Sequence, residues 1–212
     1  MLFGGRKREI KQIIESLSDG KNIILGGRFG IGRTTLIREI AKLLADERKF
    51  IFVDFSKTPG EMSEKLMREL GLSPRFKKTG RKMGYKSMRY RIATVMLSTK
   101  NKPIIIFDNI AKLTSQKIIF LRNLIEENHF QFIAIVENFL PPENLFELKA
   151  QFMPAKSITL NNLNVFDTEN LLYSYSNHNQ LNWTDNYRRN LAALTNGYPL
   201  GLTQMLKKHL TK

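Results

Sequence analysis

The stretch GGRFGIGRTTL, residues 26–36, decides how the rest of this sequence is interpreted. Gly27 and Gly32 stand at the Gly-x-x-x-x-Gly spacing of a phosphate-binding loop. Thr34 follows where such a loop carries the hydroxyl that binds Mg²⁺. Arg33, however, occupies the position where the loop ordinarily has a lysine. The stretch therefore predicts a phosphate site, and its ability to bind and hydrolyse a nucleotide depends on what this arginine does.

The flanking sequence has the order that a phosphate loop requires. The apolar run NIILGG at residues 22–27 predicts a strand, and TTLIREIAKLLADE at residues 34–47 predicts an amphipathic helix. A strand, a glycine-rich turn and a helix place backbone N–H groups around a phosphate at the helix N-terminus. The alternative is a glycine-rich turn without a ligand. The residues expected to contact a nucleotide are Gly27, Arg28, Phe29, Gly30, Ile31, Gly32, Arg33, Thr34 and Thr35.

Beyond this stretch, strand and helix patterns alternate along the chain. Further strands are expected at residues 49–55, 102–109, 130–138 and 156–160, and helices at residues 8–20, 60–71, 115–128 and 143–151. Such alternation is typical of a doubly wound α/β sheet. The last part of the chain shows helical patterns alone, at residues 168–177, 185–197 and 199–210. We therefore expect a core over residues 1–162 and a helical lid over residues 163–212.

The run PIIIFDN, residues 103–109, has the pattern of a second nucleotide-site element. Its unbroken apolar character predicts a strand buried on both faces of a parallel sheet. Asp108 ends this strand and is expected to hold Mg²⁺ together with Thr34. Asn109 follows, and its amide can orient a water molecule but cannot accept a proton from it.

The run FIAIVEN, residues 132–138, ends in two further polar residues. Asn138 is a candidate contact for the terminal phosphate or the attacking water. Glu137 is the nearest carboxylate that could replace a missing catalytic base. An equally simple interpretation is that both residues only cap a strand.

Composition favours an anionic partner. The 212 residues include 34 Lys and Arg against 19 Asp and Glu, a formal charge of +15, which favours nucleic acid over a merely basic surface. The absence of cysteine excludes disulfides and cysteine-bound metals. The first residues lack a signal peptide, and no run approaches the roughly 18 apolar residues of a membrane span. We therefore expect a soluble, cytoplasmic protein that is not bound to a membrane.

Residues 75–91 hold basic and aromatic side chains without an acidic residue. Positive charge captures phosphates and aromatic rings stack on bases, so this basic stretch is a candidate contact for nucleic acid, DNA more than RNA. A solvated connection between two helices is the alternative. An apolar helical pattern follows at Ile92, Val95, Met96 and Leu97. The candidate cations are Arg75, Lys77, Lys78, Arg81, Lys82, Lys86, Arg89 and Arg91.

Four stretches together resemble the AAA+ and STAND superfamily of P-loop ATPases, in particular its compact archaeal, origin-recognition and transposition forms. They are FGGRKREIKQI, GGRFGIGRTTL, IIIFDN and LTNGYPLGL. The resemblance implies a P-loop NTPase fold: a three-layer αβα sandwich with a mostly parallel five-stranded sheet and a small C-terminal helical lid. It further implies ATP or ADP with Mg²⁺ as cofactors and nucleotide contacts at Gly197 and Pro199 of the lid.

Two departures from the family pattern bear on activity. Arg33 replaces the family's lysine, and Asn109 replaces a glutamate that polarises the attacking water in many members. An arginine keeps the charge but binds oxygens as a planar fork, so this exchange is not conservative. We expect ATP binding with slow or absent hydrolysis, which leaves open whether the chain is an ATPase.

Three functions remain open. The first is an ATP-binding AAA+-like protein that engages nucleic acid, with nucleotide-dependent assembly of identical subunits. The second is a catalytically dead P-loop scaffold for nucleic-acid binding or assembly. The third is a nucleotide-gated signalling switch of the STAND kind, which the short chain disfavours.

Overall fold

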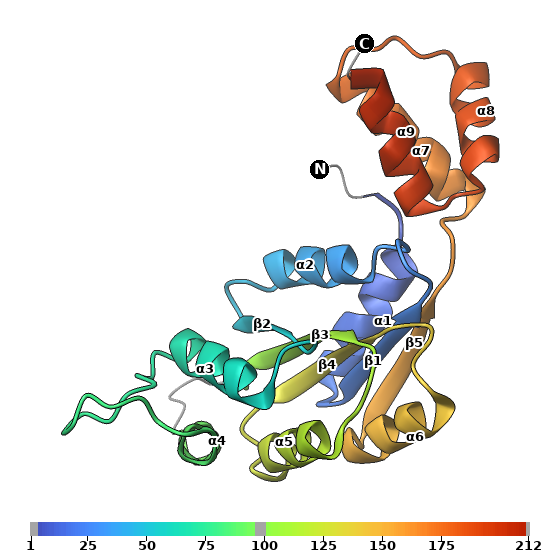
Figure 1. The fold of residues 1–212 in the computed structure, drawn as a ribbon. Helices are drawn as coiled ribbons and strands as arrows, with labels where there is room; N and C mark the ends of the chain where they lie inside the picture. Colours follow the sequence, from blue (N-terminus) through green and yellow to red (C-terminus); the bar gives the residue numbers. More distant parts are fainter. Residues whose placement is uncertain (1–3, 96–100, 211–212) are drawn as a thin grey trace.

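A parallel five-stranded sheet forms the centre of the computed structural model, which describes residues 4–95 and 101–210. Its spatial order is β2-β3-β4-β1-β5, so β1 lies between β4 and β5 (Figure 1). The strands are β1 (Asn22–Gly27), β2 (Phe50–Asp54), β3 (Ile104–Ile110), β4 (Gln131–Val136) and β5 (Ala155–Leu160). The predicted five-stranded parallel sheet is thereby confirmed.

Helices cover both faces of this sheet, as the expected three-layer αβα sandwich requires. One face carries α1 (Lys7–Ser18) and α2 (Arg33–Leu43). The other carries α3 (Pro59–Glu69), α4 (Tyr85–Ala93), α5 (Ser115–Glu126) and α6 (Pro142–Gln151). Figure 1 shows the two helical layers on opposite sides of the strands.

The two cores differ in their side chains. The α1–α2 face is aliphatic, and Ile104 and Ile106 of β3 contribute to it. Ile105 and Phe107 of the same strand point to the opposite face, where Phe107 stacks parallel to Phe132 at 6.0 Å between ring centroids. Because successive strand residues face opposite sides, a strand buried on both faces must be apolar throughout. This explains the unbroken run that the sequence shows at β3.

The last three helices pack on one another beyond these layers (Figure 1). They are α7 (Val165–His178), α8 (Asp185–Thr195) and α9 (Pro199–Leu210). Their common core includes Leu172, Leu191 and Leu202. α7 begins three residues before the expected start because the Asn164 side chain accepts a hydrogen bond from the backbone N–H of Asp167 and caps the helix there. We name α7–α9 the helical bundle.

The basic stretch 75–91 is not a single loop. Residues 75–82 form an antiparallel hairpin closed by a bridge between Arg75 and Lys82. Helix α4 follows the hairpin and ends at Ala93. The apolar helix expected around residues 92–97 is therefore wrong in its position, because α4 begins and ends earlier in the chain. Gly84 is the N-cap of α4, and buried Met88 and Ile92 dock the helix on the core. Of that expected pattern, Met96 and Leu97 lie outside the described residues.

Among the residues that the structure describes, no helix is long and apolar enough to cross a membrane.

Candidate nucleotide site

The phosphate loop joins β1 to α2 at the carboxyl end of the sheet. Gly32 caps α2 in the left-handed region at φ 91°, and Arg33 is the first helical residue. A Cβ on Gly27 would lie 2.9 Å from the Leu160 carbonyl oxygen and 2.9 Å from Ile31 Cγ2, so only glycine fits beside β5 and the returning loop. The first N–H groups of a helix have no partner within the helix. The loop therefore has the shape and the donors of an anion site.

Thr34 and Asp108 are neighbours. The Thr34 hydroxyl Oγ1 donates to Asp108 Oδ2 at 2.9 Å, although the residues lie 74 positions apart in the chain. The contact arises because β3 ends close to the start of α2. A hydroxyl and a carboxylate supply the hard oxygen donors that Mg²⁺ prefers, and Mg²⁺ usually completes its shell with phosphates and water. The residues present fit a Mg²⁺ ion bound together with a nucleotide.

Arg33 turns away from the loop and toward the end of β4. Its Nη1 donates to the carbonyl oxygen of Val136, and its Nη2 donates to Glu137 Oε2 at 2.7 Å. The Arg33 side chain is buried, with an exposed fraction of 7%, and the Glu137 side chain is partly buried, with 13% exposed. A buried guanidinium needs a counter-charge and acceptors for its donors, and this position supplies both. The charge of Arg33 is thus neutralised by Glu137 before any phosphate is bound.

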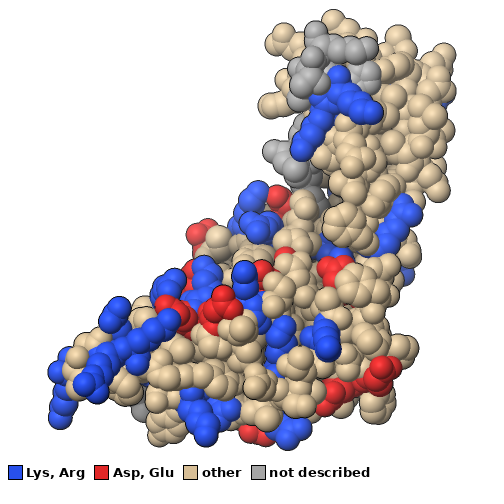
Figure 2. All heavy atoms as spheres, in the orientation of Figure 1, with Lys and Arg blue, Asp and Glu red and all other residues tan. Residues whose placement is uncertain are grey.

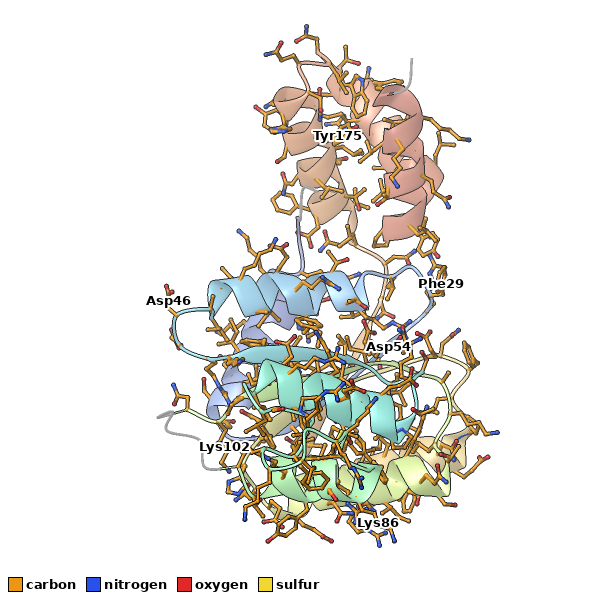
Figure 3. The ribbon with its side chains drawn as sticks, turned by 60° about the vertical axis from the view of Figure 1, so that its left-hand side comes forward. Phe29, Asp46, Asp54, Lys86, Lys102 and Tyr175 are labelled. Atoms are coloured by element: carbon orange, nitrogen blue, oxygen red, sulfur yellow. The ribbon has the colours of Figure 1, made fainter. Side chains whose placement is uncertain are left out.

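Asn109 adopts a left-handed backbone conformation at φ 63° where the pairing of β3 with β4 is irregular. Its side-chain Nδ2 donates to Asp54 Oδ1 at 3.1 Å. Asp54 ends β2, and Figure 3 shows it at the same end of the core as Phe29 of the phosphate loop. Burial raises the pKa of Asp54, but hydrogen bonds from Ser56 and Asn109 outweigh burial and leave the pKa below its usual value. The site therefore holds a carboxylate that the motifs alone did not suggest.

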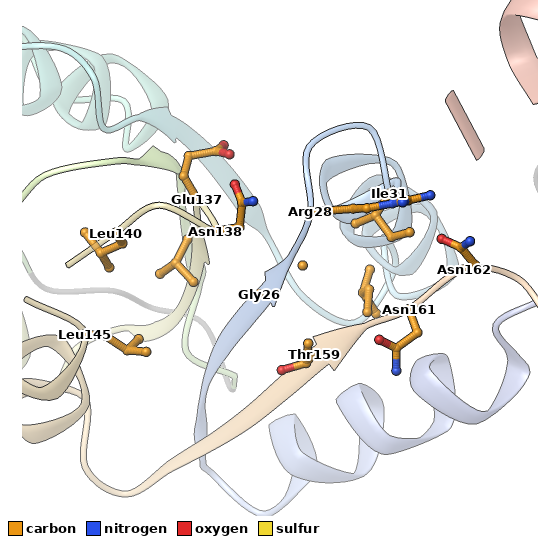
Figure 4. A pocket seen from close by; sticks show the side chains of 13 residues that line it. Gly26, Arg28, Ile31, Glu137, Asn138, Leu140, Leu145, Thr159, Asn161 and Asn162 are labelled. Atoms are coloured by element: carbon orange, nitrogen blue, oxygen red, sulfur yellow. The ribbon is translucent and has the colours of Figure 1, made fainter. Parts of the chain in front are cut away.

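A pocket of about 650 Å³ lies beside the loop, between the ends of β4 and β5. Figure 4 shows Glu137 and Asn138 on one side of it and Asn161 and Asn162 on the other, with Gly26 of β1 between them. Asn138 therefore borders this pocket. Glu137 borders it too and also lines a second pocket of about 420 Å³. That second pocket is lined by the start of α2 and by the two polar residues of β3: Gly32, Arg33, Thr34, Thr35, Asp108 and Asn109.

The helical bundle contacts the phosphate loop directly. Tyr198 Oη donates to the Phe29 carbonyl oxygen at 2.7 Å, and the Leu200 N–H donates to the Gly30 carbonyl oxygen at 3.1 Å. The Arg28 guanidinium lies 3.8 Å from the centre of the Tyr198 ring, within cation–π range. Pro199 lines the pocket of about 420 Å³. The helical bundle is therefore joined to the phosphate loop through the loop's backbone carbonyl groups.

Gly197 has a different place from Pro199. Its carbonyl oxygen accepts the Leu163 N–H at 2.9 Å, and a Cβ at this position would lie 2.0 Å from the Leu163 carbonyl oxygen. It belongs to the junction of β5 with the bundle and is not among the residues that line the two pockets. Its expected contact with a nucleotide stays a prediction.

Arg6 is a second residue that the motifs did not single out as a site residue. Its Nη2 donates to the Ile31 carbonyl oxygen at 2.8 Å and to the Asn161 carbonyl oxygen at 2.9 Å. Burial lowers its pKa, and the neighbouring Glu9 partly offsets this. Arg6 thereby fastens the loop to the end of β5. Its position within FGGRKREIKQI was the available signal, but its partners lie 25 and 155 positions away.

The predicted nucleic-acid cations fall into two groups. Five of them lie on the hairpin of residues 75–82, which we name the basic arm and which projects from the core (Figures 1 and 2). The other three lie on α4, where Arg89 stands 5.5 Å from the Tyr85 ring centre and is half-buried. The cations of the arm are all exposed: Arg75, Lys77, Lys78, Arg81 and Lys82.

The arm is anchored at its base. The Met83 side chain is buried, and its N–H donates to the Pro74 carbonyl oxygen at 2.8 Å. Lys82 pairs with Glu64 of α3 at 2.8 Å. Of the aromatic residues expected to stack on bases, Phe76 is the one on the arm, and it is 42% exposed. The arm thus presents concentrated positive charge on a short, fastened ribbon.

Comparison with known proteins places this geometry in a family. The AAA domain family matches residues 15–142, more than half of the chain, and no curated protein matches the sequence. The solved structure of the Aeropyrum pernix Orc1 protein in complex with DNA is similar over 84% of this chain and 50% of its own, at 14% identity and TM-score 0.64. Cdc6p from Pyrobaculum aerophilum is similar over 93% of this chain and 56% of its own, at 13% identity and TM-score 0.68.

A third structure is the Thermotoga maritima RuvB Holliday junction branch migration motor. It is similar over 97% of this chain and 61% of its own, at 17% identity and TM-score 0.65. The chain thus spans between half and two thirds of the length of these three proteins, and at such identities the likeness shows the fold alone. The family match, the parallel sheet and the phosphate loop lead to one conclusion: the chain belongs to the AAA domain family of AAA+ P-loop ATPases, which use a nucleotide and Mg²⁺.

Proposed function

We propose that this protein binds ATP with Mg²⁺ at the phosphate loop, hydrolyses it slowly or not at all, and engages nucleic acid through the basic arm. The observation that carries the proposal is the position of Arg33, which is paired with Glu137 and turned away from the loop. Residues 163–212 would then act as the lid of a nucleotide-binding core over residues 1–162.

Phosphate binding does not depend on Arg33 alone. The backbone N–H groups at the start of α2, together with the helix dipole, favour an anion at this position. Thr34 and Asp108, already 2.9 Å apart, would hold Mg²⁺ against the phosphates. Lid residue Pro199 borders the same pocket. These features support binding even with the arginine displaced.

Slow turnover follows from the same contacts. Phosphoryl transfer depends on positioned positive charge and an oriented water molecule. Arg33 is held by two acceptors at the end of β4, a backbone carbonyl and a carboxylate, and breaking a largely buried charge pair is costly. Glu137, the candidate replacement base, is occupied by that pairing. Asn109 cannot accept a proton. The chain would therefore hold ATP longer than a fully active member of its family.

Nucleic-acid binding is supported by the basic arm. The arm carries five exposed cations on eight residues, and its fastened base limits the entropy lost on binding. Positive side chains that neutralise phosphates release counterions and bind with little dependence on base sequence. The similar Orc1 structure was solved with DNA, which agrees with this proposal. Duplex DNA is the partner that we would test first.

Calorimetric titration of the protein with ATP and Mg²⁺, with and without duplex DNA, tests the proposal. We expect a saturable binding isotherm that requires Mg²⁺, and a shift in ATP affinity when DNA is present because two ligands that favour one state are coupled. Absence of heat with ATP, in a protein whose melting curve shows that it is folded, would contradict the nucleotide part of the proposal.

The arm is tested with a triple variant, Lys77→Ala, Lys78→Ala and Arg81→Ala. Each lost phosphate contact should reduce the slope of log affinity against log salt by about 0.9. A matched control removes three exposed cations elsewhere, with Arg8→Ala, Lys149→Ala and Lys156→Ala, and changes the net charge equally. Equal loss of DNA affinity in both variants would show that net charge, and not the arm, attracts DNA.

A further inference from the structure

We propose that Asp54 is a positioning residue of the nucleotide site, acting with Asn109 as a carboxylate–amide pair. The inference rests on the proposed function, because it concerns how a bound ATP would meet its attacking water. It assigns a role to a residue at the end of β2, outside both the phosphate loop and β3, which carries Asp108.

The sheet itself brings the pair together. β2 and β3 run parallel with Asp54 opposite Asp108, and the Phe55 N–H donates to the Asp108 carbonyl oxygen at 2.8 Å. The left-handed turn at Asn109 then directs its side chain across to β2, where Nδ2 lies 3.1 Å from Asp54 Oδ1. A non-glycine residue at positive φ is uncommon and is held by its surroundings. Here the bond to Asp54 is one of the contacts that hold it.

The other carboxylates near the loop already have partners. Asp108 accepts from the Thr34 hydroxyl and from the Asn109 N–H, at 2.9 Å each. Glu137 is paired with Arg33. Asp54 Oδ1 accepts from the Ser56 N–H at 3.0 Å and from the side chain of Asn109, the residue that replaces the family's glutamate. The pair therefore places a carboxylate beside Asn109, on β2 and not on β3.

The chemistry follows from the donor and acceptor groups of an amide. A free asparagine side chain can present either its NH₂ or its oxygen to a water molecule. Because Asp54 accepts from Nδ2, the amide is oriented and its Oδ1 remains to accept a hydrogen bond from water. The water oxygen would bond to the γ-phosphorus while the bond to the bridging oxygen breaks and its electron pair leaves with ADP. The proton of the water would pass to the phosphate product, because asparagine cannot take it.

The test compares Asp54→Ala, Asp54→Asn, Asn109→Glu and the exchanged pair Asp54→Asn with Asn109→Glu. Single-turnover hydrolysis of ATP and calorimetric ATP affinity are measured for each. We expect Asp54→Ala to lower the rate by about tenfold or more while ATP affinity is kept, as for the loss of other orienting partners. Asp54→Asn retains an oxygen that can accept from Nδ2, so it should retain most of the rate.

The exchanged pair gives the sharper result. Asn109→Glu alone places two carboxylates at hydrogen-bond distance, which disfavours the arrangement. Adding Asp54→Asn restores one carboxylate and one amide, so the exchanged pair should be faster than Asn109→Glu alone. Glu61→Ala is the matched control, since it removes a carboxylate that caps α3, the helix that follows β2, without touching Asn109, and should leave the rate unchanged.

Three outcomes would count against the assignment. A protein that does not bind ATP refutes the proposed function, and this assignment with it. With ATP bound, an Asp54→Ala rate equal to that of the unaltered protein overturns the assignment alone. Where the unaltered protein shows no turnover, the comparison of the exchanged pair with Asn109→Glu alone decides: faster turnover in the exchanged pair supports the assignment, and equal or absent turnover overturns it.

Discussion

At the scale of single residues, the partners of Arg33 explain why an arginine can stand at a lysine position. A guanidinium presents several N–H donors in a planar fork, whereas a lysine presents one compact ammonium. Arg33 uses the fork to reach the Val136 carbonyl and the Glu137 carboxylate together. The Arg33 side chain thus links the start of α2 to the end of β4 through two hydrogen bonds. A lysine ammonium would bond to both acceptors less well.

The buried pair of Arg33 and Glu137 predicts a non-additive pattern of stability. Glu137→Ala should lower the free energy of unfolding by about 3–5 kcal/mol, because it leaves a buried guanidinium without its counter-charge. Replacing both residues, with Arg33→Met and Glu137→Leu, should recover most of that loss. Urea denaturation measures both changes. Stability losses that simply add in the double variant would contradict the pairing.

At the scale of elements, three consecutive carbonyls of the phosphate loop are bound by distant parts of the chain. Phe29 and Gly30 accept from Tyr198 and Leu200 of the helical bundle, and Ile31 accepts from Arg6. The loop is thereby fastened through these carbonyls, while the first N–H groups of α2 have no partner within the helix and can bind an anion. Movement of the bundle and the shape of the loop are therefore mechanically linked.

Gly30→Ala should unseat the bundle from the loop. Gly30 has φ 72°, and a Cβ there would lie 2.6 Å from Tyr198 Oη and 2.7 Å from Leu200 Cβ. We expect faster hydrogen exchange of the Leu200 N–H, whose acceptor is the Gly30 carbonyl oxygen. Gly80→Ala is a matched control, because Gly80 has φ 65° and open space around it, so it shares the backbone strain of about 1–2 kcal/mol without the contact. Equal exchange at Leu200 in both variants would refute this account.

At the scale of the whole molecule, the phosphate site and the basic arm lie on different parts of the core. The site is at the carboxyl ends of the strands, beneath the helical bundle, whereas the arm follows α3 and projects away from the core (Figure 1). β2 links the two regions, since Asp54 ends this strand and the chain then continues into α3. The nucleic-acid binding that we propose for the arm would therefore have a short path, through β2, along which to influence the nucleotide site.

Binding of ATP with Mg²⁺ should stabilise the whole chain. At a ligand concentration of about 100 times the dissociation constant, the gain is about 2.7 kcal/mol, which raises the melting temperature by roughly 5–10 °C for a chain of this size. Chelation of Mg²⁺ should remove most of the shift. Thr34→Val, which removes the hydroxyl but keeps the shape, should reduce the part of the shift that requires Mg²⁺, since Asp108 alone then holds the ion. Thermal scanning checks each case, and an unchanged Mg²⁺-dependent shift in Thr34→Val would contradict the role of Thr34.

The contiguous parts of this protein could be predicted from the sequence, because short-range rules decide them. Glycine spacing and an apolar strand define the loop between β1 and α2, and the apolar run at β3 reflects burial on both faces. The alternation of strands and helices predicted the five-stranded sheet and its helical layers. The hairpin and the early start of α4 were missed, because their glycines and cations are equally typical of a loop.

The contacts that decide how the site works come only from the tertiary structure. Arg33 meets Glu137 across 104 positions, Asn109 meets Asp54 across 55, and Tyr198 meets Phe29 across 169. A residue type tells which bonds a side chain can make, but strand order and register determine which partner lies within reach. The sequence by itself thus determined that this chain has a phosphate loop. The folded sheet decided that the arginine of the loop faces a glutamate and that an aspartate on β2 stands beside the asparagine.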